Sequence, residues 1–211
     1  MIIAGAGNLA IDILFTLELE FNKEELFFYV DEGSPVHPII SGNYTVINKE
    51  ENLKHYFNHH PKDFIIAIGN NQAREKISEK IELLGGQNHT YISKYSRQGN
   101  YNHIHPKGNI IMHDVNITNN VTMGIGNIIY YKSILSHNQR VGNYNLVSGS
   151  VLVAESIIEN YCTIGFGAKI MSNITIKNNS IVGMGSMVIK NIEENSVVAG
   201  NPARLLYKKE S

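Results

Sequence analysis

The fold is decided by residues 111–153, which read IMHDVNITNNVTMGIGNIIYYKSILSHNQRVGNYNLVSGSVLV. A large aliphatic residue recurs at every sixth position of this stretch. These residues are Ile111, Ile117, Met123, Ile129, Leu135, Val141, Val147 and Val153. A period of six fits neither the 3.6-residue period of a helix nor the simple alternation of a half-buried strand. It fits short strands, each followed by a corner, that wind into a coil of triangular cross-section.

A second run continues the period, one residue out of step. It comprises Ile158, Ile164, Ile170, Ile176, Val182 and Val188. We expect both runs to point into a column of about five stacked coils. Small or modest residues often stand four positions later, where a corner leaves little room. They are Val121, Val151, Cys162, Ala168, Ser180 and Ser186. The shortened unit between Val153 and Ile158 is expected to form a tightened corner.

Composition excludes several classes of protein. The chain has 211 residues, a formal net charge of −1 and a pI near 6.8, so it offers no basic field for nucleic acid. The single cysteine, Cys162, permits no internal disulfide and suits a reducing compartment. No segment approaches the roughly 20 apolar residues that cross a bilayer, and the N-terminus has no signal pattern. We therefore expect a cytoplasmic protein without membrane insertion.

The N-terminal part reads as an α/β unit that begins with a β-α-β pattern. Met1 to Ala4 form an apolar strand, Gly5-Ala6-Gly7-Asn8 a turn, residues 9–21 a helix, and residues 26–30 a strand that ends at Asp31. Such glycines leave helix N–H groups facing an anion, and Asp31 is placed to accept hydrogen bonds from a ribose or a base. The unit has room for one nucleotide rather than a dinucleotide, which makes an NAD-dependent enzyme a poor fit.

The rest of this unit supplies the other strands and helices. A loop is expected after Asp31, then a strand at 44–47, a helix at 49–58, a strand at 64–68, a helix at 72–84 and a strand at 89–92. Gly69-Asn70-Asn71 closes the strand at 64–68. In a parallel sheet of this kind, ligands bind beyond the carboxyl ends of the strands.

The chain resembles a known family in four passages. They are the pairs Ile164-Gly165 and Val182-Gly183, the string VAGNPAR at 198–204, and FIIAIGNNQAREKI at 64–77. Together they resemble the bacterial hexapeptide-repeat sugar acetyltransferases of the sialic-acid O-acetyltransferase type, which include the nucleotide 4-amino-sugar N-acetyltransferases of the bacillosamine and perosamine kind. The resemblance implies a Rossmann-like nucleotide-sugar domain at 1–95, a left-handed parallel β-helix at 96–192, and a C-terminal strand and tail at 193–211.

The resemblance also implies a reaction and a catalytic residue. The reaction is transfer of an acetyl group from acetyl-CoA to the 4-amino group of a nucleotide-linked 4-amino-4,6-dideoxy sugar, for bacterial glycan synthesis. His137 matches the catalytic histidine, and an unperturbed pKa near 6.5 suits a general base. Asn138 stands where an acidic residue commonly orients that histidine. Leu9 and Leu146 stand where relatives commonly carry further histidines.

Two sets of binding residues follow from the resemblance. The nucleotide sugar is expected at Gly5, Gly7, Asn8, Asp31, Gly69, Asn70 and Asn71. Acetyl-CoA is expected in the groove between neighbouring β-helices of a homotrimer, at Gly149, Ala154, Glu155, Gly167, Ala168, Gly183, Gly185, Lys190, Pro202 and Arg204. A backbone N–H near Ala154 and Glu155 would donate to the oxyanion.

Other functions remain open. One is O-acetylation of sialic acid or a related nonulosonic acid, and another is a nucleotide-sugar-binding or scaffold protein without catalysis. A zinc-dependent carbonic anhydrase built on the same helix uses three histidines. This chain places His103, His105, His113 and His137 in that domain, but no His-x4-His pair follows His137. No metal is therefore expected.

Overall fold

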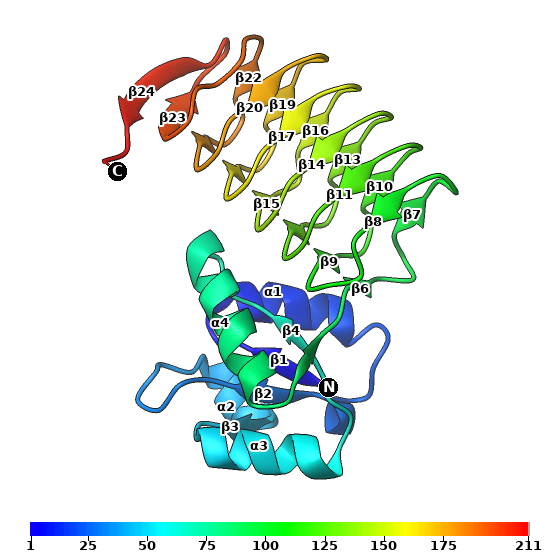
Figure 1. Cartoon of the computed structure of the whole chain (residues 1–211), viewed down its shortest axis with the longest axis vertical. Helices are drawn as coiled ribbons and strands as arrows, with labels where there is room; N and C mark the ends of the chain where they lie inside the picture. Colours follow the sequence, from blue (N-terminus) through cyan, green and yellow to red (C-terminus); the bar gives the residue numbers. More distant parts are fainter. Residues whose placement is uncertain (211) are drawn as a thin grey trace. The chain divides into compact units, whose positions relative to one another are not determined.

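The structure is a computed structural model that describes residues 1–210. The chain separates into two compact units, residues 1–93 and residues 94–211 (Figure 1). No helix within the described residues is long and apolar enough to cross a membrane.

The first unit is a parallel sheet with helices. Its strands have the order β3-β2-β1-β4-β5. They are β1 (Ile2–Ala4), β2 (Phe27–Tyr29), β3 (Thr45–Ile47), β4 (Asp63–Ile66) and β5 (Gln87–Asn88). The helices are α1 (Asn8–Leu17), the 3-10 helix η1 (Lys23–Glu25), α2 (Pro38–Asn43), α3 (Glu50–His59) and α4 (Asn71–Leu83), and β6 (Tyr91–Ile92) follows β5. Each helix and strand predicted here overlaps an observed one, but α1 ends at Leu17 and not at residue 21, and the strand predicted at 89–92 is replaced by the separate β5 and β6. Helix α2 was predicted as loop because its six residues carry only a proline signal.

The core of this unit has a simple origin in the sequence. Short apolar strands fill the centre of a parallel sheet whose two faces are both covered, so their side chains are buried without alternation. Ile2, Ile3 and Phe64 are fully buried. The order of the strands reverses between β1 and β4, and such a point opens a crevice at the carboxyl ends of the strands.

The second unit is a coil of three parallel sheets (Figure 1). The first sheet contains β7 (Arg97–Gln98), β10 (Asn116–Ile117), β13 (Ile134–Leu135), β16 (Val151–Leu152), β19 (Lys169–Ile170) and β22 (Met187–Val188). The second contains β8 (His103–Ile104), β11 (Thr122–Met123), β14 (Arg140–Val141), β17 (Ile157–Ile158) and β20 (Thr175–Ile176). The third contains β9 (Ile110–Ile111), β12 (Ile128–Ile129), β15 (Leu146–Val147), β18 (Thr163–Ile164), β21 (Ile181–Val182), β23 (Ser196–Ala199) and the antiparallel β24 (Arg204–Lys208).

The residues that recur every six positions form the core of this coil. The predicted aliphatic residues from Ile111 to Val147 and from Ile158 to Val188 are at most 3% exposed and form one cluster. Each coil has three corners, named here after the sheet whose strand precedes them. In the coil that contains His137, the first corner is residues 136–139, and the second corner is residues 142–145. The third corner precedes them at residues 130–133.

The prediction that Val153 points inward is wrong. Leu152 is fully buried and Val153 is 39% exposed, and it is Leu152 that pairs with Leu135 of the preceding coil. The count of six did not separate Leu152 from Val153 because both are large and aliphatic. The residues from Leu152 to Ile158 therefore form a full unit, and no tightened corner lies between Val153 and Ile158.

The unit that is one residue short lies at the third corner instead, between Val147 and Leu152. Gly149, with φ +47°, follows the buried Val147 by two positions. Elsewhere the left-handed residue follows by three, as Asn138 follows Leu135. The buried residue at this corner is Ser150, and Val151, which was predicted there, is a strand residue of β16. A glycine without Cβ takes this turn at little steric cost.

Asparagine side chains join the coils along the second corner. Asn127 Oδ1 accepts hydrogen bonds from the backbone N–H and from Nδ2 of Asn145, at 2.9 and 3.0 Å. Asn109 Oδ1 accepts the same pair from Asn127. The column ends where Asn145 Oδ1 accepts from the N–H of Cys162 at 2.7 Å. These amides satisfy backbone donors that a buried corner would otherwise leave unpaired.

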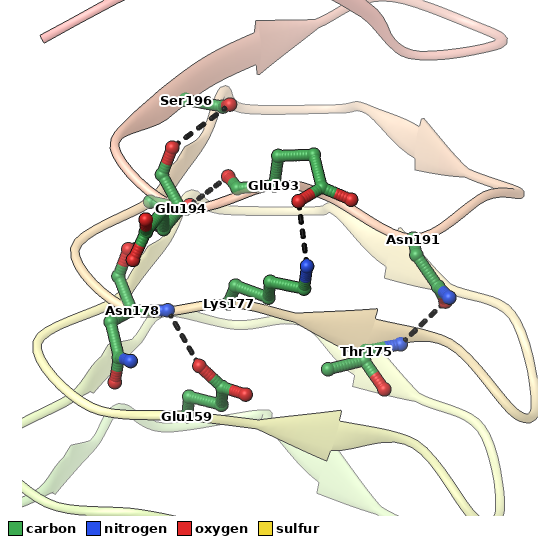
Figure 2. A network of polar contacts seen from close by, with 9 residues as sticks. Glu159, Thr175, Lys177, Asn178, Asn191, Glu193, Glu194 and Ser196 are labelled. Carbon is green, nitrogen blue, oxygen red and sulfur yellow. Dashed lines mark hydrogen bonds and ion pairs between the residues drawn. The ribbon is translucent and has the colours of Figure 1, made fainter.

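The later coils carry a more exposed polar network (Figure 2). Glu159 Oε2 accepts from the N–H of Asn178 at 2.9 Å, and Lys177 Nζ lies 2.6 Å from Glu193 Oε2. Asn191 Oδ1 accepts from the N–H of Thr175. Polar side chains therefore continue to link successive coils up to the last one.

Candidate functional site

A cavity of about 160 Å³ lies at the carboxyl ends of β1 and β2 in the first unit. The predicted residues Gly5 and Asp31 both line it. Its wall also contains Ser34, Pro35 and Ile77, which sequence reasoning did not name. The turn-rich passage after Asp31 was a signal for the first two of these, because a loop at the carboxyl end of a strand faces the crevice.

Gly5 is a glycine for steric reasons. Its φ is +107°, and a Cβ there would lie 2.7 Å from the carbonyl oxygen of Ala67. Its N–H donates to the carbonyl of Tyr29 at 2.9 Å. Only glycine allows β1 and the segment after β4 to approach this closely at the mouth of the cavity.

Gly7 and Asn8 begin helix α1. Gly7 is the N-cap, with φ −92° and no side-chain cap, and nothing lies within 4 Å of a Cβ built on it. Asn8 is exposed. Because the first N–H groups of a helix lack partners within the helix, this end is suited to an anionic ligand group.

Asp31 is held by two neighbours that sequence reasoning missed. Its Oδ1 accepts a hydrogen bond from the Tyr29 hydroxyl at 3.0 Å and from Lys80 Nζ at 2.6 Å. Lys80 also pairs with Glu50 at 2.9 Å. The hydrogen bond from Lys80 holds the pKa of Asp31 below its ordinary value. Asp31 therefore stays ionised near neutral pH, as an acceptor for ribose or base donors must.

The loop between β4 and α4 uses its polar groups internally. Asn70 is the N-cap of α4, and its Oδ1 accepts from the N–H of Ala73 at 2.9 Å. Asn71 Oδ1 accepts from Arg74 Nη2 at 2.9 Å, and Arg74 Nη1 donates to the carbonyls of Ile68 and Gly69. Arg74 is only 1% exposed. These contacts stiffen the loop, and the predicted Gly69, Asn70 and Asn71 do not line the cavity of about 160 Å³.

His137 lies on the first corner of its coil, between β13 and β14, and is exposed. Asn138 follows it in the left-handed conformation, with φ +60°. Asn138 Oδ1 accepts from Asn120 Nδ2 of the preceding coil at 2.8 Å. The amide oxygen of Asn138 is therefore bonded to the preceding coil, and no hydrogen bond joins it to the His137 ring within residues 1–210.

Ala154 and Glu155 occupy the same corner one coil later. Glu155 has φ +64°, and its N–H donates to the carbonyl of His137 at 3.1 Å. The structure thus brings together His137 and the turn that was predicted to supply the oxyanion donor. Parallel coils guarantee this contact, because equivalent corners are neighbours in the stack.

Lys190 and Arg204 meet in a separate cavity of about 360 Å³ near the last coil. Lys208 and Glu193 also line it, and Arg204 and Lys208 belong to β24. Three cations against one carboxylate make this cavity basic. It suits the phosphate groups of a nucleotide-containing ligand such as coenzyme A.

The remaining predicted acetyl-CoA residues stand on the third corner. Gly149, Gly167 and Gly185 have positive φ, and a Cβ on Gly183 would lie 2.9 Å from the Cβ of Ala199. Corner geometry alone therefore accounts for these glycines. Ala168 is fully buried in the core cluster, so its side chain faces away from any groove. Pro202 is exposed, between β23 and β24.

The histidines of the second unit do not form a metal centre in the described part of the chain. No group of three or more His, Cys, Asp or Glu side chains among residues 1–210 is arranged to hold a metal ion. His113 stacks on Tyr131 at the third corner, with ring centroids 5.2 Å apart. His113 and His137 thus lie on different corners of the coil.

Comparisons with known proteins agree with both units. Residues 1–81 match the family model described as the PglD N-terminal domain. PerB from Caulobacter crescentus, solved with CoA and GDP-perosamine, is 21% identical, with a TM-score of 0.85 over 97% of this chain and 95% of that chain. The acetyltransferase domain of PglB from Neisseria gonorrhoeae FA1090 is 22% identical, with a TM-score of 0.83 over 97% and 98%. WeeI from Acinetobacter baumannii AYE is 22% identical, with a TM-score of 0.70 over the same shares. No curated protein sequence matches.

These comparisons define the fold of the protein. The chain has the fold of PerB and of the PglB acetyltransferase domain, an α/β domain followed by a left-handed parallel β-helix, and the predicted fold class is confirmed. Residues 1–81 match the model of the PglD N-terminal domain, in agreement with the family that the sequence resembles.

Proposed function

We propose that the protein is an acetyl-CoA-dependent N-acetyltransferase that acetylates the 4-amino group of a nucleotide-linked 4-amino-4,6-dideoxy sugar. The main support is the likeness, over 97% of the chain, to a protein solved with CoA and GDP-perosamine. A second solved structure of the same fold, the PglB acetyltransferase domain, holds acetyl coenzyme A. In the proposal the first unit holds the nucleotide sugar and the β-helix holds acetyl-CoA, in a homotrimer.

The chemistry assigns one role to His137 and another to the N–H of Ala154, which lie at the first corner of successive coils. The sugar amine attacks the thioester carbonyl, a C–N bond forms, and the His137 imidazole takes the proton that the amine loses. The N–H of Ala154 donates to the oxyanion that develops on the carbonyl oxygen. When the intermediate collapses, the C–S bond breaks and the imidazolium returns its proton to the CoA thiolate. The exposure of His137 supports this role, because a general base must be open to the reacting groups.

The binding residues follow from charge and from shape. Lys190, Arg204 and Lys208 bind the phosphates of acetyl-CoA in the basic cavity. The cavity that contains Gly5 and Asp31 binds the nucleoside, with the Asp31 carboxylate as hydrogen-bond acceptor. The N-terminus of α1 lies next to Gly5 in sequence and binds a phosphate of the nucleotide.

The experiment is a rate measurement on a panel of acceptors. The protein is incubated with acetyl-CoA and UDP-, dTDP- and GDP-linked 4-amino sugars, and thiol release is followed. We expect turnover with at least one acceptor and a loss of about 10²- to 10⁴-fold in His137→Ala. His113→Ala is the matched control, because His113 also stands two residues after a buried aliphatic residue but on another corner.

Three outcomes decide the proposal. Equal rates for His137→Ala and the wild type remove His137 from the mechanism. Activity on a hydroxyl acceptor alone, such as a nonulosonic acid, replaces N-acetylation by O-acetylation. Binding of a nucleotide sugar without any turnover replaces the enzyme by a binding protein.

A further inference from the structure

Gln139 is an unusual residue at the first corner. The fourth position after each inward residue is buried at this corner, and the neighbouring coils place Val121, Ser156 and Ile174 there. Gln139 has a longer and more polar side chain than any of these, and it is still only 1% exposed. It stands two residues after His137.

The amide of Gln139 reaches the next coil. Its Nε2 donates to the carbonyl oxygen of Val153 at 3.0 Å and to Oγ of Ser156 at 3.2 Å. Because a carbonyl oxygen accepts and never donates, the amide nitrogen must face Val153, so this orientation is fixed. Its Oε1 is one of two buried side-chain atoms among residues 1–210 that have no hydrogen-bond partner. An unpaired buried acceptor costs stability, so packing alone does not favour glutamine here.

The carbonyl that Gln139 holds shares a peptide group with the N–H of Ala154. A peptide group is planar, so fixing the oxygen also fixes the direction of the N–H. A hydrogen bond to the carbonyl also polarises the group and strengthens the N–H as a donor. Gln139 therefore connects the corner that carries His137 with the peptide that carries the proposed oxyanion donor.

The N–H of Ala154 donates to no other group within residues 1–210. The second corner gives the contrast, because side-chain oxygens there bond the equivalent N–H groups. Those of Asn143 and Asn160 donate to the Oδ1 atoms of Asn160 and Asn178. The N–H of Asn178 donates to Glu159. The second corner is thus closed by its own side chains, whereas the N–H of Ala154 stays available.

We propose that Gln139 is a positioning residue for acetyl transfer, which holds the Val153–Ala154 peptide so that the N–H of Ala154 points at the developing oxyanion. The inference rests on the proposed function and deepens it. In this role Gln139 acts through the peptide group and does not contact either substrate. Because the oxyanion exists only in the transition state, the effect of Gln139 belongs in kcat and not in KM.

The first test replaces the amide by an apolar chain of similar length. Gln139→Met is expected to lower kcat by about tenfold while KM for acetyl-CoA changes by less than about twofold, since the donor is misdirected and not removed. The control is Ser133→Ala, which removes a buried hydrogen bond to the Val147 carbonyl on the third corner of the same coil. Its kcat per folded protein is expected to equal that of the wild type.

The second test uses pH and does not depend on the stability of the first variant. In Gln139→Glu, the carboxyl donates a hydrogen bond to Val153 only while it is protonated, and burial raises the pKa of such a group. The ratio of its kcat to the wild-type kcat is expected to rise by about threefold or more from about pH 8.5 to about pH 6. Dividing by the wild-type kcat at each pH compares the two proteins under the same conditions.

The outcomes separate the inference from the proposed function. If His137→Ala is inactive while Gln139→Met keeps the wild-type kcat, or if the pH ratio for Gln139→Glu is flat, the positioning role is overturned and the acetyltransferase stands. A rise in KM with unchanged kcat also overturns it, because it indicates a binding role. A wild-type protein without turnover on any acceptor overturns both.

Discussion

Lys80 Nζ lies between two carboxylates, 2.6 Å from Oδ1 of Asp31 and 2.9 Å from Oε1 of Glu50. The three residues come from different parts of the sequence, at the end of β2, the start of α3 and the body of α4. All three side chains are partly exposed, so water screens both ion pairs. The arrangement matters most for the protonation and position of Asp31 beside the nucleoside cavity.

Lys80→Met is expected to make the free energy of unfolding less sensitive to a fall in pH. The pKa of Asp31 is lowered in the folded state, so its contribution is present above the unfolded pKa and is lost as pH falls through the folded value. At pH 7 the variant should lose about 0.5–1 kcal/mol of unfolding free energy. Urea unfolding at pH 7 and near pH 3 measures this, with the exposed Lys76→Met as control. A loss that persists undiminished near pH 3 contradicts the assignment.

Gly5 and Gly7 are expected to respond differently to alanine. At Gly5 the positive φ and the contact with Ala67 predict a destabilisation of about 3 kcal/mol. At Gly7 the φ of −92° and the open space predict a loss of about 1 kcal/mol or less, since only its N-cap preference is affected. Thermal unfolding of the two variants measures the difference. Equal losses would show that the two positions are under the same constraint.

The sequence predicted the fold well because one physical constraint repeats. Each inward aliphatic residue of the β-helix occupies the same environment, so the period of six survives in the sequence from Ile111 onward. Where two aliphatic residues are adjacent, as Leu152 and Val153 are, the period does not decide which is buried. The pairing of Leu152 with Leu135 decides it, and that contact spans two coils.

The site was predictable only in part, for a related reason. His137 and Asp31 stand in local patterns, the first in the six-residue register and the second at the end of an apolar strand. Lys80 and Gln139 act through contacts between segments. Lys80 lies 49 residues from Asp31 in sequence, and Gln139 reaches across to the next coil. Neither belongs to a motif, so only the tertiary structure identifies them.

The asparagine column of the second corner is expected to contribute much of the stability of the β-helix. Asn127→Leu keeps the volume but leaves the N–H of Asn145 without its acceptor and removes the Nδ2 donor of Asn127 from Asn109 Oδ1. We expect a loss of about 3 kcal/mol by urea unfolding.

The control for this column is Asn191→Ala, whose exposed side chain bonds a single N–H, that of Thr175 (Figure 2). It should cost about 1 kcal/mol or less, because water replaces the lost acceptor. If both substitutions lower the free energy of unfolding by the same amount, burial does not determine how much the asparagine column stabilises the β-helix.

Cys162 is expected to be inert in the folded protein. Its side chain is fully buried, and burial raises the pKa of the thiol to about 11, so roughly one molecule in 10³ is a thiolate at pH 8. A disulfide reagent added at pH 8 should therefore detect no thiol within minutes in native protein and one thiol per chain in guanidinium. Cys162→Ala, which removes the only cysteine, is the control and should stay silent in both. Rapid labelling of the native wild type would show that this corner opens to solvent, and the thiol assay for acetyl transfer would then need the cysteine-free variant.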